Sequence, residues 1–151
     1  LAVQVDGDGQ HLPSEIAKIE GPVRSGEADA VIGSRFLDKS RFPGSPFRRA
    51  GIAVFQLVNR TLLGERITDS TSGFRAYNRR AIEVLAESYP DDYPEPEAIY
   101  ILRRKGLRVR EVPVEMRTRA GGKSSITLGR SFYYMVKVNL AILVLTLRKD
   151  V

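Results

Sequence analysis

The hydrophobic positions of this chain change their spacing several times, and the changes predict alternating strands and helices. Leu1–Val5 and Ala28–Gly33 are short, mostly apolar runs, which is typical of strands in a covered sheet. Between them, residues 13–24 carry isoleucines at helical spacing, with a proline in the first turn and a Gly-Pro pair that breaks the pattern late. The order strand, helix, strand predicts an α/β fold, in which ligands gather beyond the carboxyl ends of strands.

The middle of the chain predicts loops, helices and one more strand. Its Pro, Gly and Ser content makes 36–46 a loop, and 69–78 (DSTSGFRAYN) is expected to be irregular. Residues 107–115 alternate like a half-exposed strand, in which Pro113 indicates an edge position or a bulge. Apolar spacing and end signals predict helices at 47–63, 79–88 and 94–105.

The end of the chain combines a basic loop with a long apolar helix. Residues 119–125 (RAGGKSS) are rich in glycine and positive charge, and 126–148 is expected to form one helix. Lys137 and Asn139 interrupt its apolar stretch, which leaves fewer than the ~20 apolar residues that a membrane-spanning helix needs. The helix is therefore expected to pack against a partner or to lie at a membrane interface.

Composition narrows the possible functions. The chain has 151 residues, enough for one globular domain, and no cysteine, so disulfides, zinc–thiolate sites and thiol catalysis are excluded. Its net charge is +6, and residues 101–130 alone carry +7. Such a local excess suits phosphates or an anionic membrane surface and leaves nucleic acid open. A solvated basic face is the simpler interpretation.

Two aspartates, Asp6 and Asp8, follow the first predicted strand with one glycine between them. Their charges repel each other unless a cation lies between them, and Gly7 and Gly9 let the backbone turn tightly enough to bring both side chains to one ion. Gln10 offers a further, neutral oxygen. Because Mg²⁺ held by few protein oxygens keeps positions open for phosphate oxygens, the pair indicates a nucleotide or diphosphate ligand.

The acidic pair also has simpler interpretations. An EF-hand loop that starts at Asp6 would need Gly where His11 stands and Glu where Ala17 stands, so the pattern does not match one. An Asp-rich turn that caps the following helix remains open. For His11, the one histidine, a ligand or general-acid role competes with a supporting or exposed position, which is favoured.

Several motifs share an order that resembles a known family. DGDGQ after a strand, VIGSRF, DSTSGFRAYNRRA, EVPVEMRTRAGGKSSI and a terminal apolar helix resemble the family 2 glycosyltransferases of the polyprenyl-phosphate type. The resemblance implies a partial GT-A, Rossmann-like fold, with a mixed sheet flanked by helices and a long C-terminal helix. Residues 1–125 would be the acceptor-side half of the catalytic domain and 126–151 an amphipathic, membrane-associated helix.

The start of the chain fits this resemblance to half a domain. The chain has no initiator Met and no signal peptide, and it opens directly in a predicted strand. We therefore expect the nucleotide-binding half to precede it. The chain by itself is then expected to be inactive.

The resemblance implies a metal site. In the family, the two aspartates and the glutamine hold Mg²⁺ or Mn²⁺ against the diphosphate of a nucleotide-sugar, which would make Asp6, Asp8 and Gln10 the metal ligands. The metal would neutralise the charge that develops on the departing nucleoside diphosphate.

The resemblance also assigns arginines to the donor diphosphate. Arg35 and Arg49 match arginines that reach phosphate groups in the family, and Arg48 could replace Arg49. A guanidinium suits this task because it is planar and can donate hydrogen bonds to two phosphate oxygens at once. For Arg35, a surface ion pair is the alternative.

The resemblance also places carboxylates on the acceptor side. Asp69 matches the position of a carboxylate that acts as general base or orients the acceptor. A phosphate acceptor is already ionised near neutral pH, with a second pKa of about 6, so orientation is favoured. For Asp69, a turn cap is the alternative. Glu95 and Glu97 lie in a segment that faces the acceptor side in the family, and a role at the start of a helix explains them equally well.

A basic loop is expected to bind the acceptor phosphate. Arg119 matches the family's acceptor-loop arginine, to which a catalytic role is also assigned, and Gly122, Lys123 and Ser124 would cradle the phosphate beside it. Many relatives carry a lysine directly after the serine, where this chain has Ser125.

The function implied by the resemblance is sugar transfer to a lipid. A hexose would move, with inversion, from a UDP- or GDP-hexose to a dolichyl or undecaprenyl phosphate. The protein would act in the cytoplasm, at the cytosolic face of the membrane, against the lipid surface or a small membrane protein. Two alternatives remain open: a polysaccharide or protein acceptor, and a non-catalytic basic module for anionic lipid or nucleic acid. The absence of aromatic residues from 101–130 argues against nucleic acid.

Overall fold

The computed structural model describes residues 1–38, 67–89 and 94–117. The chain divides into two compact units, Leu1–Pro43 with Thr68–Ala120 and Gly44–Ile67 with Gly121–Val151. Apart from Ile67, the described residues belong to the first unit. The predictions for the helix at 47–63, the basic loop, the terminal helix and the boundary after residue 125 fall outside the described residues and stay predictions.

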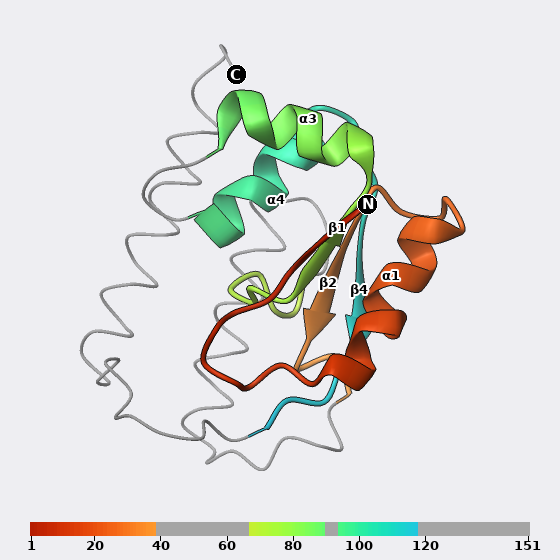
Figure 1. Ribbon diagram of the computed structural model, residues 1–151. Coiled ribbons are helices and arrows are strands. Elements are labelled where there is room, and N and C mark those ends of the chain that lie inside the picture. The colour runs from red at the N-terminus through yellow and green to blue at the C-terminus, as the bar shows by residue number, and fades with distance from the viewer. Residues whose placement is uncertain (39–66, 90–93, 118–151) are drawn as a thin grey trace, which may run out of the picture. The chain divides into compact units, whose positions relative to one another are not determined.

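The described residues form a four-stranded mixed sheet with flanking helices (Figure 1). β3 runs antiparallel to both β1 and β2, whereas β2 and β4 are parallel. Within the described part β4 is an edge strand, as Pro113 predicted. The mixed sheet confirms the expected α/β class. The strands, in the spatial order β1-β3-β2-β4, are β1 (Ala2–Gln4), β2 (Ala30–Ser34), β3 (Arg75–Tyr77) and β4 (Val109–Pro113).

Two strands differ from the sequence-based expectation. The prediction that 69–78 is irregular is correct for 69–74 but wrong for residues 75–77, which form β3 in the middle of the sheet. β1 is shorter and less covered than predicted, since the flanking Leu1 and Val5 are 49% and 48% exposed. Within the described residues β1 pairs only with β3.

The helix after β1 follows the predicted pattern with one difference. A 3-10 turn, η1 (Pro13–Glu15), leads into α1 (Ile16–Arg24). Pro22 lies inside α1 and does not end it, although a break was predicted there. A proline removes one backbone N–H from the hydrogen bonds of a helix. Pro22 lies so near the end of α1 that only two residues of the helix follow it.

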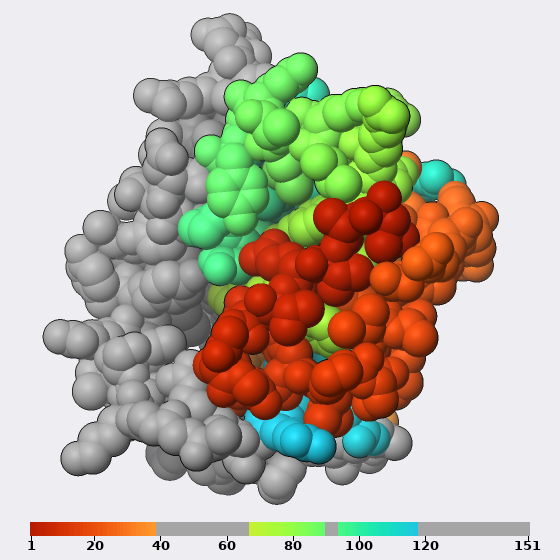
Figure 2. Space-filling model, in the orientation of Figure 1, coloured from red at the N-terminus to blue at the C-terminus, as the bar shows by residue number. Residues whose placement is uncertain are grey.

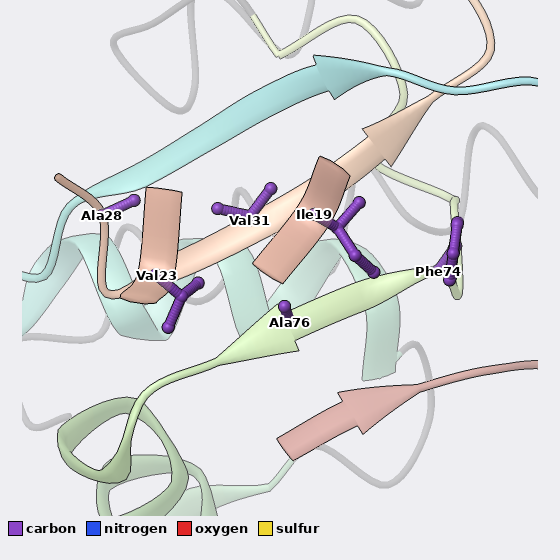
Figure 3. Packing of buried hydrophobic residues seen from close by; sticks show 6 residues of the cluster. All are labelled: Ile19, Val23, Ala28, Val31, Phe74 and Ala76. Carbon is purple, nitrogen blue, oxygen red and sulfur yellow. The ribbon is translucent and has the colours of Figure 1, made fainter. Parts of the chain in front are cut away.

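α1 packs its apolar face on one side of the sheet. Figure 3 shows α1 lying across β2 and β3, with α4 on the opposite face. Phe74 and Ala76 point to the same face because residues two apart in a strand share a side. The buried cluster consists of Ile19, Val23, Ala28, Val31, Phe74 and Ala76.

Two helices, α3 (Arg79–Ser88) and α4 (Pro94–Arg104), confirm the predicted ranges within a residue. The Asn78 side chain caps α3 by accepting a backbone N–H of the first turn at 2.8 Å. Glu95 and Glu97 lie in the first turn of α4, where carboxylates face the positive end of the helix. This is the helix-start position predicted as their alternative role.

Asp29 joins three elements at the edge of the sheet where β2 and β4 begin. Its Oδ2 accepts the backbone N–H of Arg108 at 2.8 Å and the Nε–H at 3.2 Å. Its Oδ1 accepts the side-chain amide of Asn78 at 2.8 Å. Burial alone would raise the pKa of Asp29, but the bonds from Arg108 and Asn78 outweigh it and hold the pKa below the ordinary value of 3.8.

We expect Asp29→Ala to lower the free energy of unfolding by about 2 kcal/mol, because buried donors lose their acceptor. The folded protein holds Asp29 ionised more firmly than the unfolded chain. This contribution is therefore present above about pH 4 and is lost as the pH falls through the lower folded pKa. Urea unfolding of both proteins at several pH values measures it. Glu83→Ala, which breaks only an exposed pair with Arg79, is the matched control.

Candidate functional site

Four chain segments meet at one edge of the sheet (Figure 1). Because β3 runs opposite to its neighbours, the segment before β3 lies beside the segments that follow β1, β2 and β4. Asp6 and Asp8 follow β1, Arg35 follows β2 and Asp69 precedes β3. Open α/β sheets bind ligands beyond the carboxyl ends of their strands, and this is that edge for β1, β2 and β4.

Arg35 and Asp69 form a bidentate ion pair at this edge. Nε and Nη2 of Arg35 donate to the two oxygens of the Asp69 carboxylate, each at 2.8 Å. The backbone N–H of Arg35 adds a third bond at 3.0 Å. The Asp69 side chain is fully buried and that of Arg35 is 34% exposed, so the guanidinium forms the solvent side of the pair.

Neighbouring carboxylates raise the pKa of Arg35. Burial alone would lower the pKa of Arg35, but the bonds to Asp69 raise it above its ordinary value, and the charges of Asp6 and Asp8 add to the rise. Nη1 of Arg35 has no hydrogen-bond partner among the described residues. The charges of three carboxylates therefore act on one guanidinium, and of these carboxylates Asp69 is in direct contact with it.

The two predicted metal ligands Asp6 and Asp8 have different surroundings. The Asp6 side chain is 51% exposed, and Figure 2 shows the first residues of the chain, in red, uncovered beside α1. Oδ1 of Asp8 accepts the N–H of Gln10 at 3.1 Å and closes a turn around Gly9, whose φ is +75°. Neither aspartate caps the following helix, because η1 begins after Leu12 without a side-chain cap.

His11 supports Asp6 from the protein side. Its side chain is only 4% exposed and stacks on Phe74, with ring centroids 4.7 Å apart. Nδ1 accepts the backbone N–H of Asp6 at 3.1 Å, and Nε2 lies 3.7 Å from Asp6 Oδ2. A supporting position agrees with this geometry, whereas an exposed one does not.

Gln10 links the acidic turn to the chain beyond β4. Its backbone carbonyl accepts the N–H of Arg117 at 2.9 Å, and its side-chain amide donates to the Arg117 carbonyl at 3.3 Å. The neighbours His11 and Met116 form an antiparallel bridge. The side-chain nitrogen of Gln10 is thus engaged, and its side-chain oxygen is the atom suited to a metal.

The fit of this edge to a metal rests on its donors. Among residues 1–38, 67–89 and 94–117, no group of three or more His, Cys, Asp and Glu is placed to hold an ion. No Lys or Arg of the described residues lies within 4 Å of the Asp6 carboxylate. Two aspartates and an amide oxygen suit a hard cation that takes its other ligands from phosphate or water. The donor types at this edge are those that Mg²⁺ and Mn²⁺ prefer, and the metal site stays a prediction.

Glu111 is a site residue that sequence analysis did not find. It lies in β4 opposite Ile32, and its carboxylate accepts the backbone N–H groups of Thr68 and Asp69 at 2.8 and 2.7 Å. In an alternating strand, a charged residue indicates the solvent side, so the pattern concealed it. Only the pairing of β4 with β2 brings the Glu111 carboxylate within hydrogen-bonding distance of Thr68 and Asp69.

Gly73 leaves room for Asp6, which makes it a steric test of the acidic pair. A Cβ added at Gly73 would lie 2.5 Å from Asp6 Oδ1. Because that atom ends a flexible side chain, we expect Gly73→Ala to fold and to displace the carboxylate. Mn²⁺ affinity of the intact protein should fall about tenfold by calorimetric titration. Gly21→Ala, with nothing near its added Cβ, should bind as the wild type, and equal Mn²⁺ affinity in both variants would contradict the prediction.

Two basic residues of 101–130 pair with acidic side chains in the described part. Arg108, just before β4, pairs with Asp29, and Arg110, in β4, pairs with Glu27. Several predicted ligands lie outside the described residues, so the structure does not place them: Arg48, Arg49, Arg119, Gly122, Lys123 and Ser124.

Comparison with known proteins identifies relatives, although no family model matches the chain. The chain is 34% identical over 118 residues to UDP-N-acetylglucosamine–dolichyl-phosphate N-acetylglucosaminyltransferase of Methanococcus voltae, covering 76% of this chain and 47% of that protein. It is 33% identical over 131 residues to polyprenol monophosphomannose synthase of Mycolicibacterium smegmatis, covering 84% and 49%. This chain is homologous to the family 2 polyprenyl-phosphate glycosyltransferases.

Further relatives agree with this relationship. Undecaprenyl-phosphate mannosyltransferase of Micrococcus luteus is 33% identical over 133 residues, which cover 85% of this chain and 54% of that protein. The mixed sheet with flanking helices is consistent with part of a GT-A, Rossmann-like fold. The chain spans about half the length of the curated relatives it matches. Within the described residues, no helix has the length and apolar character needed to cross a membrane.

Proposed function

We propose that the protein carrying this chain transfers a hexose from a nucleotide-diphospho-sugar to a polyprenyl phosphate. The observation that carries the proposal is the agreement among three relatives. One name specifies N-acetylglucosamine and two specify mannose, but all three refer to the same class of lipid, a dolichyl, undecaprenyl or other polyprenyl phosphate. The charged edge of the sheet supports it with residues suited to a diphosphate.

The donor diphosphate would bind between the acidic pair and Arg35. Asp6, Asp8 and Arg35 with its partner Asp69 carry two more negative than positive charges, which by themselves repel a diphosphate. A divalent cation held by Asp6, Asp8 and the Gln10 oxygen would cancel this excess of negative charge and supply Lewis-acid stabilisation of the leaving group. The open Nη1 of Arg35 would donate to a phosphate oxygen.

The role we propose for Asp69 is to orient Arg35. Both of its oxygens accept bonds from the guanidinium, and accepting a proton would weaken them. A phosphate acceptor needs no base, because it is already ionised near neutral pH with a second pKa of about 6. Direct attack by that phosphate on the anomeric carbon would invert its configuration. The acceptor phosphate would be gathered by Arg119, Gly122, Lys123 and Ser124.

The site would operate at the cytosolic membrane face. A lipid acceptor requires the protein to reach the bilayer, for which we propose the terminal helix at 126–148, acting on the lipid surface or on a small membrane protein. The non-catalytic basic module is disfavoured, because Arg108 and Arg110 are engaged with acidic partners away from Asp6.

A transfer assay on the intact protein tests the proposal. Radiolabelled UDP-hexoses and GDP-hexoses are supplied in turn with Mn²⁺ and a polyprenyl phosphate in detergent, and glycolipid is counted after extraction. We expect product with one donor and none after chelation of the metal. Transfer to a polysaccharide or protein acceptor alone would replace the lipid proposal. Binding of RNA or DNA without hydrolysis or transfer of any donor would overturn it.

A further inference from the structure

The segment that presents Asp69 to Arg35 is held by a carboxylate from another strand. Oε2 of Glu111 accepts the backbone N–H of Thr68 at 2.8 Å and its hydroxyl at 3.0 Å. Oε1 accepts the backbone N–H of Asp69 at 2.7 Å. The Thr68 hydroxyl also lies 2.7 Å from that of Ser34, the last residue of β2. Glu111 therefore fixes the two residues at the start of the segment.

Arg75 holds the rest of the same segment from β3. Its Nη2 donates to the Ser70 carbonyl at 2.8 Å and its Nε to the Ser72 carbonyl at 2.7 Å. The Ser72 hydroxyl donates to the Gly33 carbonyl at 2.7 Å. Glu111 accepts N–H bonds from this segment and Arg75 donates to its carbonyls. Together they restrict the backbone conformation of 68–72.

The position of Glu111 is unfavourable for its own charge. Burial raises the pKa of Glu111 above its ordinary value of 4.5, and the nearby Asp69 adds to the rise, while the bonds from Thr68 and Asp69 offset only part of it. The folded protein thus holds a proton on Glu111 more tightly than the unfolded chain, and ionised Glu111 lowers stability as the pH rises. Carboxylates in such surroundings are typical of functional sites.

We propose that Glu111 is a positioning residue of the diphosphate site. By fixing the backbone of Thr68 and Asp69 from β4, Glu111 sets the position of the carboxylate that holds the Arg35 guanidinium. The inference rests on the proposed function only in requiring that Arg35 faces a diphosphate. Glu111 itself touches no reacting group.

Glu111→Gln separates this role from simple packing, since the two side chains have nearly the same shape. The amide has one oxygen and one N–H₂ group, so either Thr68 or Asp69 would face a donor where it now has an acceptor. We expect Glu111→Gln to weaken the binding of Mn²⁺–pyrophosphate to the intact protein by about 10- to 100-fold, as measured by calorimetric titration.

A double-mutant cycle with Arg35→Lys shows whether Glu111 acts through the ion pair. Lysine keeps the charge but cannot make the bidentate contact with Asp69. If Glu111 works through that contact, Glu111→Gln should cost less than about threefold further in the Arg35→Lys protein. Losses that multiply in full would overturn the proposal, as would wild-type affinity in Glu111→Gln. If Glu111→Gln does not fold, Glu111→Asp, which keeps the charge but shortens the reach, takes its place in the cycle.

The control and the transfer assay keep this proposal apart from the proposed function. Glu27→Gln removes an exposed carboxylate that contacts Arg110, which neighbours Glu111 in β4 and points to the other face of the sheet, and this variant should bind Mn²⁺–pyrophosphate as the wild type does. If the wild type binds Mn²⁺–pyrophosphate but transfers no hexose to polyprenyl phosphate, the proposed function fails. The role of Glu111 is then decided by the double-mutant cycle alone. If the wild type binds no Mn²⁺–pyrophosphate, Arg35 does not face a diphosphate and the positioning proposal is overturned.

Discussion

Asp8→Asn or Asp6→Asn in the intact protein is expected to lower kcat/KM for hexose transfer by about 10²- to 10³-fold. Each substitution removes a negative ligand from a hard cation and, with it, the stabilisation of charge on the leaving diphosphate. The side chain keeps its shape, and Asp6 is half exposed, so stability should change by less than about 1 kcal/mol. Initial rates at increasing Mn²⁺ concentration measure the effect.

The dependence on metal concentration distinguishes ligand loss from general damage. If the aspartates bind the metal, the variants should need more Mn²⁺ to reach their maximal rate, and raising Mn²⁺ should recover part of the lost activity. Glu83→Gln, which changes an exposed carboxylate of α3, should leave both quantities unaltered. Full activity of either aspartate variant with an unchanged Mn²⁺ requirement would remove the metal from the mechanism.

Arg35→Ala is expected to have two effects that a second substitution separates. It leaves the fully buried Asp69 without its partner, which should lower the free energy of unfolding by about 3 kcal/mol. It also removes the N–H groups for which we propose a contact with the diphosphate, which should lower kcat/KM by about 10²-fold or more. Chemical unfolding and initial-rate kinetics on the same preparation measure the two effects.

The double variant Arg35→Ala with Asp69→Ala tests the division of roles. Removing both charges relieves the unpaired buried carboxylate, so stability should recover by roughly half or more of the loss. Activity should not recover, because the phosphate contact is still missing. Recovered activity in the double variant would mean that Arg35 only neutralises Asp69. Transfer by Arg35→Ala at the wild-type rate would show that the diphosphate binds elsewhere.

The order of elements could be predicted where local pattern and burial agree. β2 is an unbroken apolar run that the sheet buries on both faces, and α1, α3 and α4 each carry apolar spacing with end signals such as Asn78. β3 could not be predicted, because its three residues include Arg75, a charge that strand patterns place in solvent. Backbone carbonyls satisfy that guanidinium, those of Ser70 and Ser72 just before the strand and that of Glu95 in α4, and a strand pattern contains no sign of these bonds.

The residues of the candidate site could largely be predicted from the sequence, but the contacts between them could not. Asp6, Asp8 and Gln10 were first predicted from the chemistry of their side chains, and Arg35 and Asp69 from motifs that resemble a family, but the contact between Arg35 and Asp69 was not predicted. The bidentate contact of Asp69 with Arg35 crosses 34 positions of the chain, and that of Glu111 with Thr68 crosses 43. The supporting residues Glu111 and Gly73 carry no local signal for their roles.

The sequence by itself determined the α/β class, most of the elements and the residue types able to hold a metal and a diphosphate. These follow from apolar spacing and from the chemistry of individual side chains, which are local properties. Only the tertiary structure decided that Asp69 binds Arg35 and that Glu111 holds Asp69. Those contacts depend on strand order and on β3 running against its neighbours, and pairing between distant strands is set by the packing of the whole sheet.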